Sequence, residues 1–237
     1  MGDFDRYDTL SFDCYGTLID WETGIAAALR PWAERNRLAV GDDELVATFG
    51  AVETVVETEH PTDPYPEILA EVMRRIGGRL GAPVVDAEAT AFGATVGDWP
   101  VFPDTAEALA RLAGRYRLVI LSNVDRRSFA ASNRRLGVVF DRIVTAEDVG
   151  AYKPARAMFD ALLAAVEAMG SKRSRLLHVA ESLYHDHLPA AEAGIDSVWI
   201  HRRFDRDGFG ATHPPEGDVH PKWRFTSMAD FAEAVLG

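Results

Sequence analysis

Asp13 is the first residue whose position could support covalent catalysis. It follows a β-prone run from Tyr7 to Phe12 and opens a turn that contains Gly16. A carboxylate there could attack an electrophilic carbon or phosphorus and form a covalent intermediate, which divides one difficult hydrolysis into two easier steps. Position alone favours an ordinary turn aspartate, so the chemical interpretation depends on partners elsewhere in the chain.

Polar residues near the ends of later β-prone runs could be those partners. Ser122 and Asn123 follow an apolar run and can donate hydrogen bonds to the nucleophile or to a substrate. Lys153, which precedes a proline, could hold Asp13 ionised, because a cation within about 4–6 Å lowers the pKa of a carboxyl group. Thr17 and the backbone N–H groups after Asp13 could stabilise the charge that develops in the reaction.

The order of strand-like and helical segments predicts an α/β fold. Strands are expected at residues 7–12, 118–121, 143–145, 176–180 and 198–200, with helices between the later ones. One helix is expected to begin at Asp104, whose carboxylate would cap the first turn together with Glu107. Such alternation predicts a doubly wound parallel sheet, and these sheets bind ligands beyond the carboxyl ends of their strands, where Asp13 and Ser122 fall.

Residues 19–97 differ from the rest of the chain. No convincing strand occurs there, and amphipathic helical segments follow one another at residues 25–35, 44–56 and 65–76. We interpret this stretch as a helical insertion. Residues 203–222 are rich in Gly and Pro and predict a long loop.

Composition and charge exclude several classes of protein. The chain has 237 residues, of which 47% are hydrophobic, and a formal net charge of −12, which disfavours binding to nucleic acids or anionic membranes. A single cysteine cannot form an internal disulfide and suits a reducing compartment. We find no signal-peptide pattern and no apolar run near the roughly 20 residues that span a bilayer, so we expect a soluble cytoplasmic protein.

Four segments in order resemble the motifs of the haloacid dehalogenase (HAD) superfamily. They are Phe12-Asp-Cys-Tyr-Gly-Thr-Leu18, Ser122-Asn123, Tyr152-Lys-Pro154 and Glu181-Ser-Leu-Tyr-His-Asp186. The resemblance implies a Rossmann-like core, residues 1–18 and 98–237, with a helical cap at residues 19–97. It also implies the set of catalytic residues, namely Asp13 as nucleophile with Thr17, Ser122, Asn123, Lys153, Glu181 and Asp186.

Two departures from the pattern bear on the reaction. HAD phosphatases carry a second Asp where this chain has Tyr15, and a tyrosine with a pKa near 10 is a poor general acid. The dehalogenase branch has Tyr at that position, as here, which favours attack on carbon. Magnesium-dependent members have Asp where this chain has Glu181, so we expect no metal cofactor, with Mg²⁺ as the less favoured alternative. We expect Glu181 to pair with Lys153, and Asp186 to orient Lys153 or the hydrolytic water.

The cap lacks the arginine stretch that receives the halide in L-2-haloacid dehalogenases. Residues 49–60 contain Glu53, Glu57 and Glu59 and no Lys or Arg. We expect Glu57 or Glu59 to lie on a solvated face, whereas Glu53 would attract a cation if it faced the cleft. The remaining candidates for substrate binding are Arg30 as a carboxylate anchor, Trp21 and Trp99 as apolar walls, and Cys14, Tyr15, Ser182 and His185 near the nucleophile.

These features support a ranked set of hypotheses. The first is a 2-haloacid dehalogenase-like hydrolase of a small carboxylate, acting through an ester on Asp13. The second is ring opening of L-azetidine-2-carboxylate, because several segments resemble that subgroup and a protonated ring nitrogen needs no general acid. A phosphatase is third, and a non-catalytic HAD fold is disfavoured by the intact Asp13, Ser122 and Lys153. We expect a monomer or homodimer with a small-molecule partner.

Overall fold

The computed structural model describes residues 3–215 and 217–237, which contain one sheet of six parallel strands. The sheet order is β3-β2-β1-β4-β5-β6, so the chain reverses its direction of winding between β1 and β4. The predicted α/β class with a doubly wound sheet is confirmed. The strands are β1 (Thr9–Phe12), β2 (Arg117–Ser122), β3 (Arg142–Thr145), β4 (Leu176–Ala180), β5 (Asp196–Ile200) and β6 (Trp223–Phe225).

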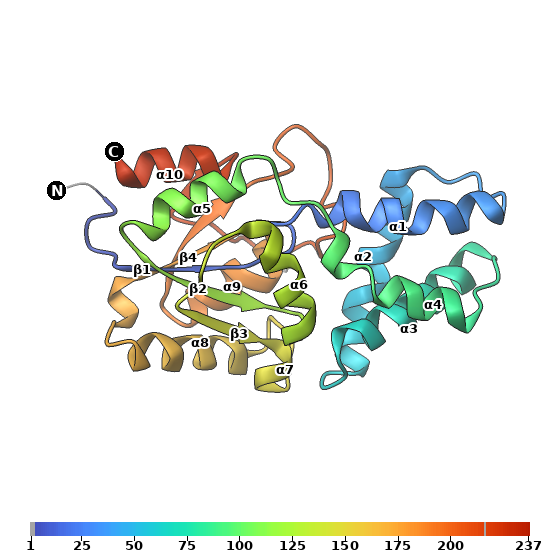
Figure 1. Cartoon of the computed structure of the whole chain (residues 1–237), viewed down its shortest axis with the longest axis horizontal. Coiled ribbons are helices and arrows are strands. Elements are labelled where there is room, and N and C mark those ends of the chain that lie inside the picture. The colour runs from blue at the N-terminus through green and yellow to red at the C-terminus, as the bar shows by residue number, and fades with distance from the viewer. Residues whose placement is uncertain (1–2, 216) are drawn as a thin grey trace.

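Helices cover both faces of this sheet (Figure 1). Alternate residues of β2 point to opposite faces, so that Ile120 joins one hydrophobic cluster and Leu121 joins another. Both clusters are apolar, which explains the nearly continuous apolar sequence of β2. The first cluster packs under α5 (Thr105–Ala113), α6 (Arg126–Leu136) and α10 (Met228–Leu236), and the second under α8 (Arg156–Ala168) and α9 (Leu188–Glu192), with the short α7 (Ala146–Val149) before α8.

Four helices between β1 and β2 stand to one side of the sheet (Figure 1). The first begins at Trp21 because the Asp20 side chain accepts a hydrogen bond from the backbone N–H of Thr23. This arrangement agrees with a helical insertion, while its division from the core at residues 18/19 and 97/98 stays a prediction. The helices are α1 (Trp21–Arg35), α2 (Asp42–Glu59), α3 (Tyr65–Leu80) and α4 (Asp86–Gly93).

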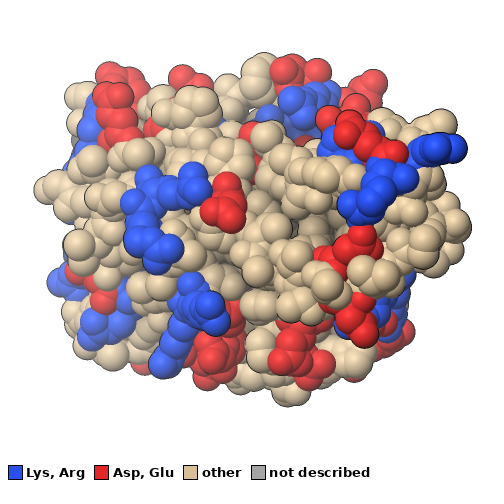
Figure 2. All heavy atoms as spheres, turned by 45° about the vertical axis from the view of Figure 1, so that its right-hand side comes forward, with Lys and Arg blue, Asp and Glu red and all other residues tan. Residues whose placement is uncertain are grey.

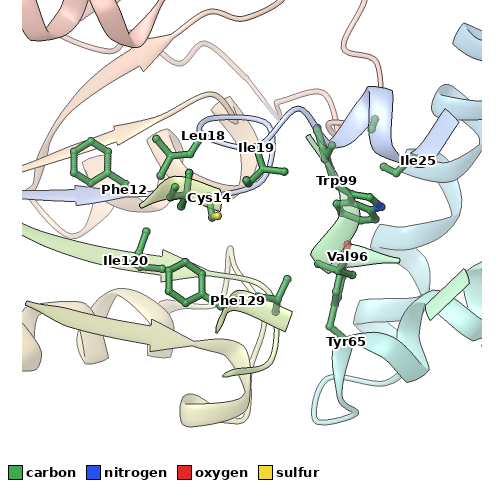
Figure 3. Close-up of a cluster of buried hydrophobic side chains, with 14 of the residues drawn as sticks. Phe12, Cys14, Leu18, Ile19, Ile25, Tyr65, Val96, Trp99, Ile120 and Phe129 are labelled. Carbon is green, nitrogen blue, oxygen red and sulfur yellow. The ribbon is translucent and has the colours of Figure 1, made fainter. Parts of the chain in front are cut away.

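One hydrophobic cluster runs from the sheet into these helices (Figure 3). It includes Phe12 on β1, Ile25 on α1 and Trp99, which lies between them. The backbone of α1 comes so close to Trp99 that a Cβ on Gly24 would lie 2.4 Å from the indole ring. This close approach fixes α1 against the core, and thereby fixes the cap next to the strand ends.

The structure corrects two expectations outside the site. The Asp104 carboxylate makes no capping hydrogen bond at the start of α5, and instead accepts from Arg202 Nη1 at 2.9 Å and from the backbone N–H of Met228 at 2.6 Å. Arg202 also donates to the backbone carbonyl of Thr17. Asp104 therefore ties the end of β5 and the start of α10 to the turn after Asp13. The short strand β6, which follows the predicted loop, was not expected.

No helix within the described residues is long and apolar enough to cross a bilayer. On the face drawn in Figure 2, basic and acidic side chains are interspersed.

We expect Asp104→Ala to lower the free energy of unfolding by about 2–4 kcal/mol, because it leaves the nearly buried guanidinium of Arg202 without its carboxylate. Urea denaturation measures this change. Glu107→Ala, an exposed change in the same helix, is the control and should cost well under 1 kcal/mol. Equal effects of the two substitutions would contradict this role for Asp104.

Candidate active site

A buried lysine bridges two aspartates at the carboxyl ends of β1 and β4. Lys153 Nζ lies 2.8 Å from Asp13 Oδ1 and 2.8 Å from Asp186 Oδ1. The three side chains are 2%, 8% and 1% exposed. This is the place where the sheet reverses its winding, and parallel sheets bind their ligands at such a point. The predicted pairing of Lys153 with Asp13 is therefore present in the structure.

The register of the sheet brings these residues together. Phe12 is aligned with Ile120 of β2 and Val179 of β4, so the segments that follow the three strands are neighbours. Asp13 begins the turn after β1, and Asp186 lies in a single π-helical turn after β4, Leu183–His187. The two carboxylates are 173 residues apart in the sequence, and both of them contact the same ammonium group.

Both oxygens of Asp13 are held in place. Oδ1 accepts from Lys153, and Oδ2 accepts from the Thr17 hydroxyl at 2.6 Å. Gly16 adopts φ +92°, a left-handed conformation that allows the tight turn between them. Burial raises the pKa of the Asp13 carboxyl, and the charge of Lys153 with the Thr17 hydrogen bond limits this rise. The carboxylate is thereby presented in a fixed orientation for nucleophilic attack.

Asp186 is ionised and partly unpaired. Its Oδ1 accepts from Lys153 and is 3.0 Å from His178 Nε2, which is oriented in turn by Ser11. Burial opposes ionisation, but Lys153 and His178 outweigh it and hold the pKa of Asp186 well below its usual range. Its Oδ2 is buried and has no hydrogen-bond partner among the residues described. Asp186 thus orients Lys153, as expected, and keeps one oxygen free to accept a hydrogen bond.

Asn123, which follows β2, positions the lysine rather than the nucleophile. The Asn123 side chain accepts from the backbone N–H of Lys153 at 2.6 Å and donates to its carbonyl at 3.2 Å. The same amide lies 3.4 Å from both carboxylate oxygens of Glu57 in the cap. Ser122 is fully buried, and its hydroxyl has no partner within the described part of the chain.

A cavity lies beside Asp13, between the strand ends and the cap. Four acidic side chains line it, against Lys153 as the only Lys or Arg among the described residues of its wall. The predicted Tyr15, Trp21, Ser182 and His185 all take part in this wall. The full lining consists of Asp13, Tyr15, Trp21, Glu53, Glu57, Tyr65, Asn123, Val124, Lys153, Ser182, His185, Asp186 and Thr212.

Two glutamates one turn apart on α2 form the cap side of the cavity. Glu53 and Glu57 are only 4% and 6% exposed, so the expectation that Glu57 is solvated is wrong. The Tyr65 hydroxyl donates to Glu53. Burial raises the pKa of Glu53 to about 7, and burial together with the charge of Glu53 raises the pKa of Glu57 well above its ordinary value. Glu59, which is exposed and paired with Arg75, fits the expectation of a solvated face.

Three other predicted roles need correction. Arg30 forms an ion pair with Asp42 and donates to the Val40 carbonyl, which holds its guanidinium at the ends of α1 and α2 and away from the cavity wall. Trp99 lies behind the wall, where its ring packs edge-on against Tyr15 at 5.6 Å. Cys14 is fully buried in the hydrophobic cluster next to the nucleophile (Figure 3) and does not line the cavity.

Glu181 does not pair with Lys153 as expected. Its carboxylate accepts from the Thr212 hydroxyl at 2.9 Å and lines a neighbouring cavity with Arg202 and Arg203. Burial raises the pKa of Glu181 to about 8. Lys153 pairs instead with Asp186, because that residue comes from the turn nearest the ammonium group.

The acidic residues do not fit a magnesium site of the kind found in phosphatase members of this fold. Lys153 occupies one oxygen each of Asp13 and Asp186, and Glu181 is held by Thr212 outside the cavity. No three potential metal ligands converge anywhere in residues 3–215 and 217–237. Mg²⁺ prefers several oxygen ligands in octahedral geometry, so we derive no catalytic step through a metal.

Sequence analysis missed several wall residues and one supporting residue. Glu57 could have been found from its spacing, because residues four apart share one face of a helix and Glu53 was already a candidate. His178 lies inside a predicted strand, where a polar residue flanked by apolar ones needs a buried partner. Tyr65, Val124 and Thr212 carried no such signal.

Comparison with known proteins identifies the family. The profile of the haloacid dehalogenase-like hydrolases matches residues 7–194. The chain belongs to this family. It is therefore a hydrolase with the HAD fold, as its motifs indicated.

Individual relatives differ in what they act on. The pyrimidine 5'-nucleotidase YjjG of Escherichia coli is 26% identical to this chain over 135 residues, which are 56% of either protein. The chain spans about half the length of the curated relatives it matches. The L-2-haloacid dehalogenase of Xanthobacter autotrophicus, solved with chloropropionic acid covalently bound, superposes with a TM-score of 0.78 at 18% identity over 98% of this chain and 99% of that one. The magnesium-bound HAD-hydrolase YfnB of Bacillus subtilis has a TM-score of 0.78 at 17% identity over 98% and 100%. These structural likenesses establish the fold.

We expect the free energy of unfolding to fall by about 2 kcal/mol between pH 5 and pH 7 through Glu53 alone. Its pKa of about 7 in the folded chain exceeds the ordinary value of 4.5, so the folded state binds this proton more tightly and loses stability as the pH rises. Urea denaturation at several pH values measures the slope. Glu53→Gln should make the slope less steep, because Glu57 and Glu181 still contribute to it, whereas Glu59→Gln, an exposed change on the same helix, should leave it unchanged. An identical slope in all three proteins would contradict the burial of an ionisable Glu53.

Proposed function

We propose that this chain hydrolyses a small 2-substituted carboxylate by attack of Asp13 on carbon, and that its leaving group is a protonated amine. The strained ring of L-azetidine-2-carboxylate is the substrate that best suits the cavity. The observation that carries this proposal is the buried pair Glu53 and Glu57 in the wall beside the nucleophile.

The leaving group is inferred from the charge of the cavity. A departing halide gains negative charge and needs donors or cations near it, whereas a protonated amine loses positive charge as its bond to carbon breaks. Four carboxyl groups and one already engaged ammonium line the cavity. A bound cation offsets the cost of burying Glu53 and Glu57, because an opposite charge favours their ionised forms. The cavity therefore suits an ammonium group better than a halide, and this reverses the order of our first two hypotheses.

In the first step, an Asp13 oxygen forms a bond to the ring carbon and the C–N bond breaks, with its electron pair going to nitrogen. The product is an alkyl ester of Asp13 that carries a neutral amine. One member of the Glu53–Glu57 pair keeps a proton near neutral pH, since both pKa values are raised, and can protonate the released amine. Lys153 and Thr17 hold the attacking carboxylate in place.

In the second step, water attacks the ester carbonyl of Asp13 and releases the hydroxy acid. Asp186 Oδ2 is a free acceptor next to Lys153 and can orient this water and pass its proton to the departing alkoxide. The oxygen of the water remains in the Asp13 carboxylate. Its second proton returns to the Glu53–Glu57 pair, which gave one to the amine in the first step. No metal is required, because an uncharged carbon does not repel the nucleophile as a phosphate dianion does.

A 2-haloacid is the second candidate substrate class. The sequence Asp13-Cys-Tyr-Gly-Thr17 supports attack on carbon, since the Tyr15 hydroxyl is held by Ser132 at 2.9 Å and is not available as an acid. The same feature, and the acidic cavity, disfavour a phosphatase. The nucleotidase relative covers only about half of the chain and leaves this ranking unchanged.

We expect Asp13→Asn to reduce turnover by at least about a thousandfold without loss of the fold, because the amide keeps the shape of the side chain but not its nucleophilicity. In water labelled with heavy oxygen and with enzyme in excess, the label should enter Asp13 before it enters product. Mass spectrometry of the Asp13 peptide measures this. Label found directly in the first product molecules would exclude the ester mechanism.

We expect Glu53→Gln to slow hydrolysis of L-azetidine-2-carboxylate about 10- to 100-fold, the effect of losing a charge-assisted contact of about 1.5–3 kcal/mol. The same variant should leave any 2-chloropropionate activity unchanged or improved, since the negative charge near the halide is reduced. Steady-state rates for both substrates and p-nitrophenyl phosphate, each with Mg²⁺ and with EDTA, provide the comparison.

Glu59→Gln is the matched control for this experiment and should behave as the wild-type enzyme. If 2-chloropropionate is the only substrate that is turned over, and Glu53→Gln slows this reaction, then the leaving group is a halide and not an amine. Activity on the phosphate ester that is lost with EDTA and restored by Mg²⁺ would move the phosphatase to first place.

A further inference from the structure

His185 carries a buried ring nitrogen that the reaction above does not use. It belongs to the π-helical turn after β4, and its ring lines the same cavity as Asp13 and Asp186. The Nε2 atom is buried and has no hydrogen-bond partner in the described part of the chain. The Asp186 Oδ2 atom also lacks a partner, so these two atoms do not satisfy one another. A buried polar atom in a cavity wall indicates a ligand group that completes it.

The other ring nitrogen bears on the tautomer. Nδ1 lies 3.2 Å from the Ser182 hydroxyl, whose oxygen already accepts from the backbone N–H of His185 at 3.0 Å. A Ser182 hydroxyl that donates its proton to Nδ1 leaves the hydrogen of the neutral ring on Nε2. Burial lowers the pKa of His185 to about 4, so the ring is neutral near pH 7 and keeps that single proton.

A neutral donor at this point is unusual in so acidic a cavity. Other donors in the wall are already engaged: Lys153 with the two aspartates, Asn123 with the Lys153 backbone, and Tyr65 with Glu53. The Thr212 hydroxyl donates to Glu181. Apart from the protonated member of the Glu53–Glu57 pair, only His185 and the indole N–H of Trp21 are side-chain donors of the described wall for which no acceptor is found. A substrate carboxylate must meet such donors, since the four acidic groups repel it.

We propose that His185, held by Ser182 as the Nε2–H tautomer, binds the carboxylate of the substrate and selects carboxylated amines over the bare amine. The ammonium group would then face Glu53 and Glu57, and the carboxylate would face His185. The orientation of the reacting carbon rests on the proposed function, but recognition of the carboxylate can be tested without turnover. His185 is in this proposal a substrate-positioning residue.

Calorimetric titration with L-proline and pyrrolidine tests the proposal, because these unstrained cyclic amines differ only in the carboxylate. We expect wild-type protein to bind L-proline more tightly. His185→Phe, which keeps a ring against Tyr184, should weaken binding of L-proline about 10- to 100-fold and leave binding of pyrrolidine unchanged. His185→Gln, whose amide N–H reaches nearly as far as Nε2, should recover most of the loss.

A second measurement reports the tautomer directly. Nitrogen-15 NMR of histidine-labelled protein should show the Nε2–H form of His185 in the wild type, and a mixture of tautomers in Ser182→Ala. A wild-type protein that binds the two amines equally, or binds neither, would overturn the proposal. So would equal weakening of both ligands in His185→Phe, or an Nδ1–H tautomer.

The outcomes separate this proposal from the proposed function. If L-azetidine-2-carboxylate is not hydrolysed but L-proline binds through His185, the chemistry fails and the carboxylate site stands. If the ring is opened and His185→Phe lowers kcat without changing KM, the histidine orients the hydrolytic water, and the carboxylate site fails alone.

Discussion

The contact of one buried ammonium with two carboxylates is the interaction on which the rest of the structure depends. Without Lys153, Asp13 and Asp186 would be like charges in a site of low dielectric constant, and one of them would take up a proton. Asn123 holds the backbone of Lys153, and the register of the sheet brings the two aspartates to it. The pairing of Asp13, the proposed nucleophile, with Lys153 therefore depends on three strand ends acting together.

The acidic side of the cap costs free energy, in contrast to the paired charges around Lys153. Glu53 and Glu57 are buried without a basic partner among the described residues of the cavity wall, which costs free energy in the absence of a ligand. A cation that enters the cavity would recover part of this cost, so the proposed selectivity for an ammonium group would follow from the same unfavourable burial. In the proposed reaction, the core supplies the nucleophile and the cap meets the leaving group.

Similarity of fold does not show which leaving group a site accepts. The dehalogenase and the magnesium-bound hydrolase superpose over nearly the whole chain at 18% and 17% identity, and they differ in what their sites hold. The differences that matter here are single side chains, namely Tyr15 held by Ser132 and Glu181 turned toward Thr212. They remove the acid and a metal ligand of the phosphatase pattern without changing the sheet.

The sequence by itself determined the class of fold and singled out Asp13 as the candidate nucleophile, because the apolar strands alternate with helices and Asp13 begins a distinctive turn after the first of them. It also placed Lys153 beside Asp13, since the motifs occur in a fixed order along a sheet of known topology. Only the tertiary structure decided the direction of longer side chains. It turned Glu57 inward and Arg30 outward, because helical periodicity gives the face of a residue but not what packs against that face. The acidity of the cavity depends on the packing of the cap against the strand ends, which no local pattern encodes.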